Sequence, residues 1–100
     1  MDKKQFRSIG HHLKPVVTVA GAGLTANVLT EIGRALQDHE LIKLRLSIAD
    51  RTVRTETSAA ICTEHRAELI QSIGKIILIF RKNSRADPKK SNLIRFLDKL

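Results

Sequence analysis

The sequence contains no tryptophan and no tyrosine, and its only aromatic residues are Phe6, Phe80 and Phe96. A protein that recognises nucleic acid by stacking several bases on aromatic rings needs more such side chains. Cys62 is the only cysteine, so these 100 residues cannot form an internal disulfide. A chain of this kind fits a reducing compartment.

Long hydrophobic runs are missing as well. No segment approaches the roughly 18 apolar residues that a membrane span needs. The first residues, MDKKQFRSIGHHLK, lack the apolar centre of a signal peptide. We therefore expect a cytoplasmic protein with no membrane partner. Hydrophobic residues still make up 42% of the 100 residues, which is enough for one compact domain.

Patterns typical of catalytic or metal sites are also absent. The histidines His11, His12, His39 and His65 show no His-x-x-x-His spacing, and there is no Cys-x-x-Cys motif. Cys62 follows two alanines and an isoleucine, which favours a core position. A Cys62–His65 pair is possible by its i, i+3 spacing, but such a nucleophile would have no oxyanion site nearby. We expect a non-catalytic protein without metal, cofactor or small-molecule substrate.

The positive charge is concentrated at the two ends of the chain. Lysine and arginine outnumber aspartate and glutamate by 18 to 10, and the net charge is +8. Residues 15–80 are neutral, residues 1–14 carry +3 and residues 81–100 carry +5. Basic ends of this kind suit a polyanion such as RNA. The alternative is a solvated fringe that only aids solubility.

Hydrophobic periodicity and capping residues predict seven elements. They are a helix over residues 3–13, a strand over 16–19, a helix from an N-cap at Thr25, a strand over 41–48, a helix from Asp50 to about Arg66, a strand in the second half of 67–74, and a strand over 75–81. The order α-β-α-β-α-β-β predicts a small α/β (α+β) two-layer sandwich. It would have a mixed four-stranded sheet and helices mainly on one face.

For two of these elements the sequence also predicts which side chains face the core. Residues 41–48 alternate, so one side of the strand is apolar while Lys43 and Arg45 occupy the other side. The third helix is expected to point Val53, Ala60 and Ile61 inward.

The C-terminal segment differs from the rest. We divide the chain into a domain over residues 1–82 and a basic tail over residues 83–100, which has a possible short helix at 91–100. On that helix Leu93, Phe96, Leu97 and Leu100 would share one face. Ten residues are marginal for an isolated helix. The segment therefore either docks on the domain or becomes ordered on a partner.

The sequence GAGLTA, residues 21–26, lies between a strand and a helix. It lacks the third glycine of a dinucleotide fingerprint and the Gly-Lys-Ser/Thr ending of a phosphate loop. What remains is a glycine-containing turn with exposed N–H groups at a helix N-terminus, which suits a sugar–phosphate chain. The alternative is a plain strand-to-helix junction.

Four short motifs occur in a characteristic order: HHLKPVV (11–17), GLT (23–25), HELIK (39–43) and GK…FR (74–81). On these motifs the sequence resembles, from about Lys3 to Lys82, the bacterial YhbY proteins. These are stand-alone CRM domains, named for chloroplast RNA splicing and ribosome maturation. The resemblance implies a fold similar to the C-terminal domain of bacterial translation initiation factor 3. It also implies a Gly-x-x-Gly loop, similar to that of KH domains, that clamps RNA backbone, and an association with precursors of the large ribosomal subunit.

The family loop maps onto Ala20-Gly21-Ala22-Gly23, in which the first glycine is replaced by Ala20. Either Gly21 supplies the missing freedom one position later, or the loop binds more weakly and the basic ends carry more of the affinity. Phe80 stands where the family commonly has tyrosine.

The prediction is therefore a monomeric RNA-binding protein that acts in ribosome assembly on rRNA. The expected RNA-binding residues are Lys14, Ala20, Gly21, Ala22, Gly23, Leu24, Thr25, Lys43, Arg45, Lys75, Arg81 and Lys82. The alternative is a protein-interaction module that uses the C-terminal amphipathic segment, with the basic ends serving solubility.

Overall fold

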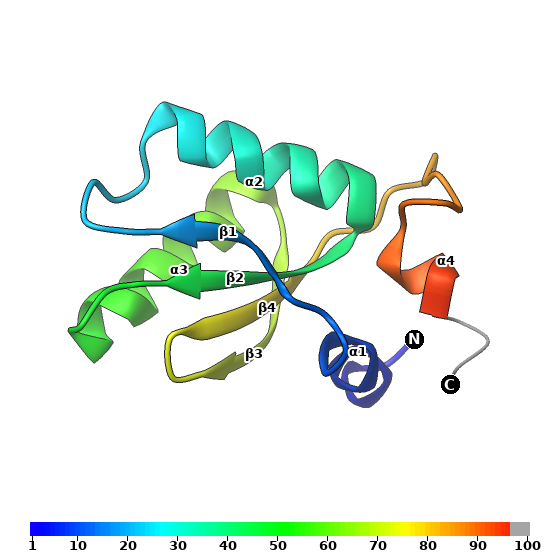
Figure 1. Cartoon of the computed structure of the whole chain (residues 1–100), viewed down its shortest axis with the longest axis horizontal. Helices are drawn as coiled ribbons and strands as arrows, with labels where there is room; N and C mark the ends of the chain where they lie inside the picture. Colours follow the sequence, from blue (N-terminus) through cyan, green and yellow to red (C-terminus); the bar gives the residue numbers. More distant parts are fainter. Residues whose placement is uncertain (97–100) are drawn as a thin grey trace.

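A computed structural model describes residues 1–96. The elements are helix α1 (Lys3–Gly10), strand β1 (Pro15–Val19), helix α2 (Ala26–His39), strand β2 (Leu41–Leu46), helix α3 (Arg51–His65), strand β3 (Glu68–Ile73), strand β4 (Ile76–Phe80) and helix α4 (Asn92–Phe96). One mixed sheet has the order β1-β2-β4-β3, in which β1 is parallel to β2 and the other neighbours are antiparallel (Figure 1). The predicted element order and mixed four-stranded sheet are confirmed.

Local capping starts the first three helices. The Thr25 hydroxyl accepts a hydrogen bond from the amide of Val28 at 3.2 Å, and the Asp50 carboxylate accepts one from Val53 at 3.1 Å. Both caps agree with the sequence prediction. Asp2 and Gln5 form a reciprocal capping box at α1. Each cap satisfies amides that the helix itself leaves without an acceptor.

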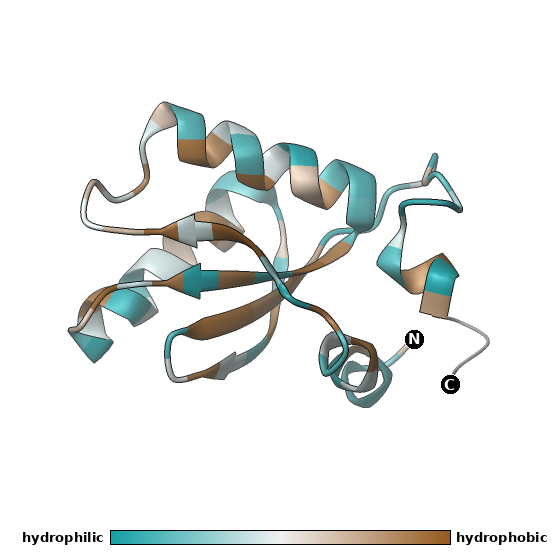
Figure 2. Cartoon of the chain, in the orientation of Figure 1, coloured by the Kyte–Doolittle hydropathy of each residue, from teal (hydrophilic) through white to brown (hydrophobic). Residues whose placement is uncertain are grey.

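The larger core lies between one face of the sheet and the two long helices. Its buried residues are Val17, Val19, Ile32, Leu36, Ile42, Leu44, Leu46, Ile61, Ile77 and Ile79. Figure 2 shows the hydrophobic residues of α2 on the side that faces the sheet. The long helices thus share one face, as predicted.

A smaller core covers one end of the opposite face. It contains Phe6, Ile9, Leu41, Ile70 and Leu78, so α1 packs across β2, β3 and β4. The contact is close, because a Cβ at Gly10 would lie 2.5 Å from Leu78 Cδ2. Leu41 is therefore buried although it lies on the side of β2 that the sequence assigned to cations.

Several boundaries differ from the prediction. Helix α1 ends at Gly10 rather than at residue 13, because the amides of His12 and Leu13 turn back to the carbonyls of Ile9 and Gly10. Strand β2 ends at Leu46, after which the amide of Ile48 bonds to the carbonyl of Leu46 in a tight turn.

The packing of α3 and the start of β3 also differ. Val53 is 42% exposed and Ala60 is exposed, so both inward assignments are wrong, whereas Ile61 is fully buried as predicted. Ser58 takes the second buried position. Strand β3 begins at Glu68, so it occupies more than the second half of residues 67–74.

The described part of the tail docks on its own domain. The Glu40 carboxylate, only 5% exposed, accepts hydrogen bonds from the Asn83 amide at 2.9 Å and from the Ser91 hydroxyl at 2.7 Å. Asn92 donates to the carbonyl of Leu41 at 2.8 Å. Leu93 packs against the smaller core. The predicted helix is present over Asn92–Phe96, and the predicted positions Leu97 and Leu100 lie outside the described residues.

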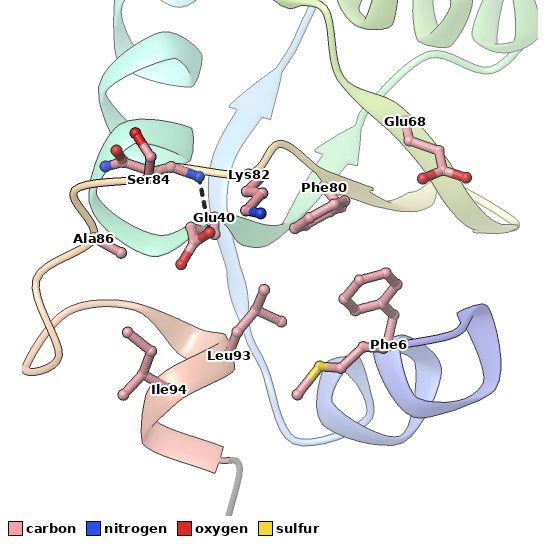
Figure 3. A pocket seen from close by; sticks show the side chains of 11 residues that line it. Phe6, Glu40, Glu68, Phe80, Lys82, Ser84, Ala86, Leu93 and Ile94 are labelled. Carbon is pink, nitrogen blue, oxygen red and sulfur yellow. Dashed lines mark hydrogen bonds between the residues drawn. The ribbon is translucent and has the colours of Figure 1, made fainter.

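A hollow of about 570 Å³ lies where the tail meets the domain. Figure 3 shows Phe6 and Phe80 on one side of it and Leu93 and Ile94 on the other. The Phe6 and Phe80 rings stack with centroids 4.5 Å apart.

Candidate functional site

The loop between β1 and α2 is built on a tight turn. The Gly23 amide donates to the Ala20 carbonyl at 2.8 Å, and the Thr25 amide donates to the Gly23 carbonyl at 3.0 Å. Gly23 has φ +73°, a left-handed conformation that favours glycine. The left-handed residue of this loop is therefore Gly23 and not Gly21.

Within this loop, the amides of Gly21, Ala22 and Leu24 have no acceptor among residues 1–96. Gly21 and Ala22 are exposed, and Leu24 is half-buried. The loop leads directly into α2, whose N-terminal end carries the positive end of a 14-residue helix dipole. Such an arrangement can accept an anion.

Gly21 is a position in this loop where the fold itself does not need a glycine. A Cβ built at this position meets no atom within 4 Å, and its φ lies outside the left-handed range. Neither packing nor backbone conformation inside the protein requires a glycine here.

Two of the predicted cations lie at the same end of the sheet as the loop. Arg45 pairs with Thr18 on one side and with Ile76 on the other. The amide of Leu46, beside the end of β1, donates to the carbonyl of Lys75. Arg45 and Lys75 are both exposed. We call residues 20–25 together with Arg45 and Lys75 the loop-end surface. Lys43 lies two residues farther back on β2.

The remaining predicted cations do not join this surface. Lys14 precedes β1 and Lys82 follows β4, so both lie toward the opposite end of the sheet (Figure 1). Arg81 is engaged inside the protein, because its guanidinium donates to the carbonyls of Gly33 and His65, each at 3.2 Å. The twelve predicted residues therefore do not form one continuous site, and Arg81 links the C-terminal part of α3 to α2.

The contact around Arg81 was not foreseen from the sequence. A Cβ at Gly33 would lie 3.4 Å from His65 Cε1, so the glycine lets α2 approach α3. His65 Nε2 is buried without a hydrogen-bond partner among residues 1–96. Burial, together with the charge of Arg81, lowers the pKa of His65. The only sign of this contact in the sequence is Gly33, a glycine within the apolar stripe of the second helix.

Features that could support catalysis or metal binding are weak in the described part of the chain. Burial raises the pKa of the half-buried Cys62 thiol, which opposes thiolate formation. Within residues 1–96, no group of three His, Cys, Asp or Glu side chains is placed to hold a metal ion. Over the same range, no helix is long and apolar enough to cross a membrane.

Comparison with known proteins agrees with the motifs. Residues 1–81 match the CRS1 / YhbY (CRM) domain. A Pseudomonas aeruginosa protein named "Probable RNA-binding protein" is 53% identical over 94 residues, which cover 94% of this chain and 90% of the relative. A Haemophilus influenzae protein named "RNA-binding protein" is 44% identical over 85 residues, covering 84% and 86% of the two chains.

A solved structure shows the same fold. The solution structure of a hypothetical Staphylococcus aureus protein, described as an RNA-binding candidate, superposes with a TM-score of 0.74 at 28% sequence identity. The match covers 83% of this chain and 86% of the other.

Proposed function

The chain belongs to the CRS1/YhbY (CRM) domain family, and we propose that it binds RNA by holding a sugar–phosphate backbone against the loop-end surface. The names of its relatives support the ligand class. The observation that carries the proposal is Gly21, an unobstructed glycine that the fold itself does not need. It stands beside amides that have no acceptor among residues 1–96.

The mechanism is one of backbone recognition. Phosphate oxygens accept hydrogen bonds from the amides of Gly21, Ala22 and Leu24, and the dipole of α2 favours their negative charge. Arg45 and Lys75 add cationic contacts beside the loop. Because Gly21 has no side chain, the RNA backbone can come within hydrogen-bonding distance of the loop amides.

Contacts of this kind position an RNA but do not read its sequence. With three phenylalanines and no tryptophan or tyrosine, the chain has few platforms for base stacking. Specificity would therefore come mainly from the shape of the RNA.

For the biological role we propose non-catalytic assistance in ribosome assembly, with the protein acting as a monomer on rRNA of large-subunit precursors. The family resemblance supports this role. Sedimentation of a cell lysate tests it, because the protein should co-migrate with large-subunit precursors. A protein found only in the free fraction would contradict the assembly role while leaving RNA binding intact.

The central experiment is a graded series at Gly21, measured by fluorescence anisotropy with a structured RNA. Gly21→Ala, Gly21→Val and Gly21→Leu should weaken binding progressively, since each covers more of the loop amides. Stability should stay within about 0.5 kcal/mol of wild type, because the position is exposed and unstrained. Ala60→Leu, on the exposed face of α3, is the matched control and should not change affinity. Equal affinity across the Gly21 series would mean that the loop is only a junction.

Salt dependence gives an independent measure. Wild-type affinity should fall at least about tenfold between about 50 and 200 mM salt if two or three phosphates are neutralised. A flat response would remove the electrostatic part of the proposal.

A further inference from the structure

Helix α1 covers only part of the sheet face that lies opposite the long helices. Strand register places Thr18, Arg45, Ile76 and Ile73 in one row across the four strands. Directly paired residues point to the same side of a sheet, so this row shares the face that carries Leu78 and α1. We call the part of that face formed by this row, Lys43 and Gln71 the open face.

The open face combines exposed apolar surface with a shallow hollow. Ile73 is 65% exposed, the largest exposure among the large hydrophobic side chains of residues 1–96. Beside it, a hollow of about 210 Å³ is lined by Lys43, Gln71, Ile73, Ile76 and Leu78. Apolar side chains that lie together on the exposed surface of a small protein often mark a contact site.

Charge narrows the choice of occupant. Lys43 and Arg45 project from the central strand β2 onto this face, and neither forms an ion pair with any residue in the range 1–96. A second copy of this chain would set these cations against its own cations, in a protein that already carries +8. An occupant that presents anionic groups and flat apolar groups together fits better, and an unpaired RNA strand presents both.

The open face also continues from the loop-end surface. Thr18 directly precedes Val19, after which the loop begins, and Arg45 belongs to both surfaces. An RNA strand held by the amides of Gly21 and Ala22 can therefore continue onto the open face while staying in contact with the protein.

We propose that an unpaired RNA segment runs from the loop across the open face, with phosphates on Arg45 and Lys43 and a base in the hollow against Ile73 and Ile76. This inference rests on the proposed function and specifies its ligand as single-stranded. In a duplex each base is stacked between its neighbours, so its flat side is not available to Ile73.

The test compares an unpaired RNA oligonucleotide of mixed sequence with an RNA duplex of the same length, using fluorescence anisotropy on the full chain. Ile73→Ser should weaken binding of the unpaired RNA about fivefold, because apolar contact area is lost. Binding of the duplex should not change. Val53→Ser is the matched control, since Val53 is also an exposed aliphatic residue (42%) but lies on α3, and it should change neither affinity.

Three outcomes would overturn the inference. In the first, Ile73→Ser binds the unpaired RNA as tightly as wild type does. In the second, Ile73→Ser loses the same affinity for both RNAs. In the third, the wild-type protein self-associates and Ile73→Ser abolishes the association. The last would assign the face to self-association. If Gly21→Val still weakens binding in any of these cases, the proposed function stands and only the single-strand path fails. If wild type binds neither RNA, the proposed function fails as well.

Discussion

The two ends of the sheet use their polar groups in opposite ways. At the loop end, the amides of Gly21, Ala22 and Leu24 find no acceptor among residues 1–96. At the other end, the tail and the start of β2 are joined by specific hydrogen bonds. The carboxylate of Glu40 has two donors, Asn92 bonds to the carbonyl of Leu41, and the Nδ1–H of His39 donates to the carbonyl of Lys90 at 2.8 Å.

The difference follows from burial. Glu40 and Asn92 are buried, so a lost partner there leaves a polar group without water. Gly21 and Ala22 are exposed, so their amides remain accessible to water. We infer that the tail end is specialised for stability and the loop end for exchange of partners, and the predictions below test this division.

Glu40→Ala should have the largest effect. It removes the acceptor for the Asn83 amide and the Ser91 hydroxyl. Because both hydrogen bonds go to a buried charged group, we expect the unfolding free energy to fall by about 3 kcal/mol. Urea denaturation measures the loss, and Ser91→Ala should cost less because it removes only one of the two bonds. RNA affinity of the folded variant should stay at the wild-type level. An RNA defect in a fully folded Glu40→Ala protein would break the division between the ends.

Arg81→Met comes next. It removes two side-chain hydrogen bonds to carbonyls, at Gly33 and His65, and should lower the unfolding free energy by about 2 kcal/mol. Lys82→Met, at the exposed neighbouring position, should be neutral in the same urea experiment. Weakened RNA binding without loss of stability in Arg81→Met would restore the sequence-based assignment of Arg81 to the RNA site.

The two loop glycines should respond differently to alanine. Gly23→Ala places a side chain on a backbone with φ +73° and should cost about 1 kcal/mol of stability. Gly21→Ala should cost almost nothing, because its φ lies outside the left-handed range and the space around it is open. Thermal unfolding of the pair measures the contrast, and equal losses would mean that the loop conformation differs from the one described.

Replacing one lysine at each end of the sheet should change the salt dependence of RNA affinity differently. Lys75→Gln should reduce the slope of log affinity against log salt by about 0.7 to 1, since one phosphate contact is lost. Lys82→Gln should leave the slope unchanged. Equal reductions in the two variants would extend the RNA site along the whole sheet.

The smallest expected effect is a pH dependence from His65. Burial and the charge of Arg81 lower its pKa from the ordinary value of 6.5. The unfolded chain therefore binds the proton more tightly, and stability should fall as the pH decreases through 6.5. His65→Gln should make the unfolding free energy less dependent on pH below neutrality than it is in wild type. An unchanged dependence would show that the other histidines or the carboxylates account for it.

Sequence reasoning succeeded where the physics is local. Thr25 and Asp50 were recognisable as caps because a cap bonds to an amide three residues away. Val53 and Ala60 were misassigned because α3 packs through a narrow stripe around Ser58 and Ile61. A mixed apolar and polar helix does not reveal such a stripe by composition alone.

The sequence by itself determined the order of helices and strands, the helix caps and an open glycine turn before α2, since these depend on residues within a few positions of one another. Only the tertiary structure decided which cations lie beside that turn, why Arg81 does not, and how Glu40 is buried. Arg81 bonds to a carbonyl 48 residues away, and Glu40 bonds to a hydroxyl 51 residues away. Contacts at that separation depend on strand pairing and helix packing, which no local pattern specifies.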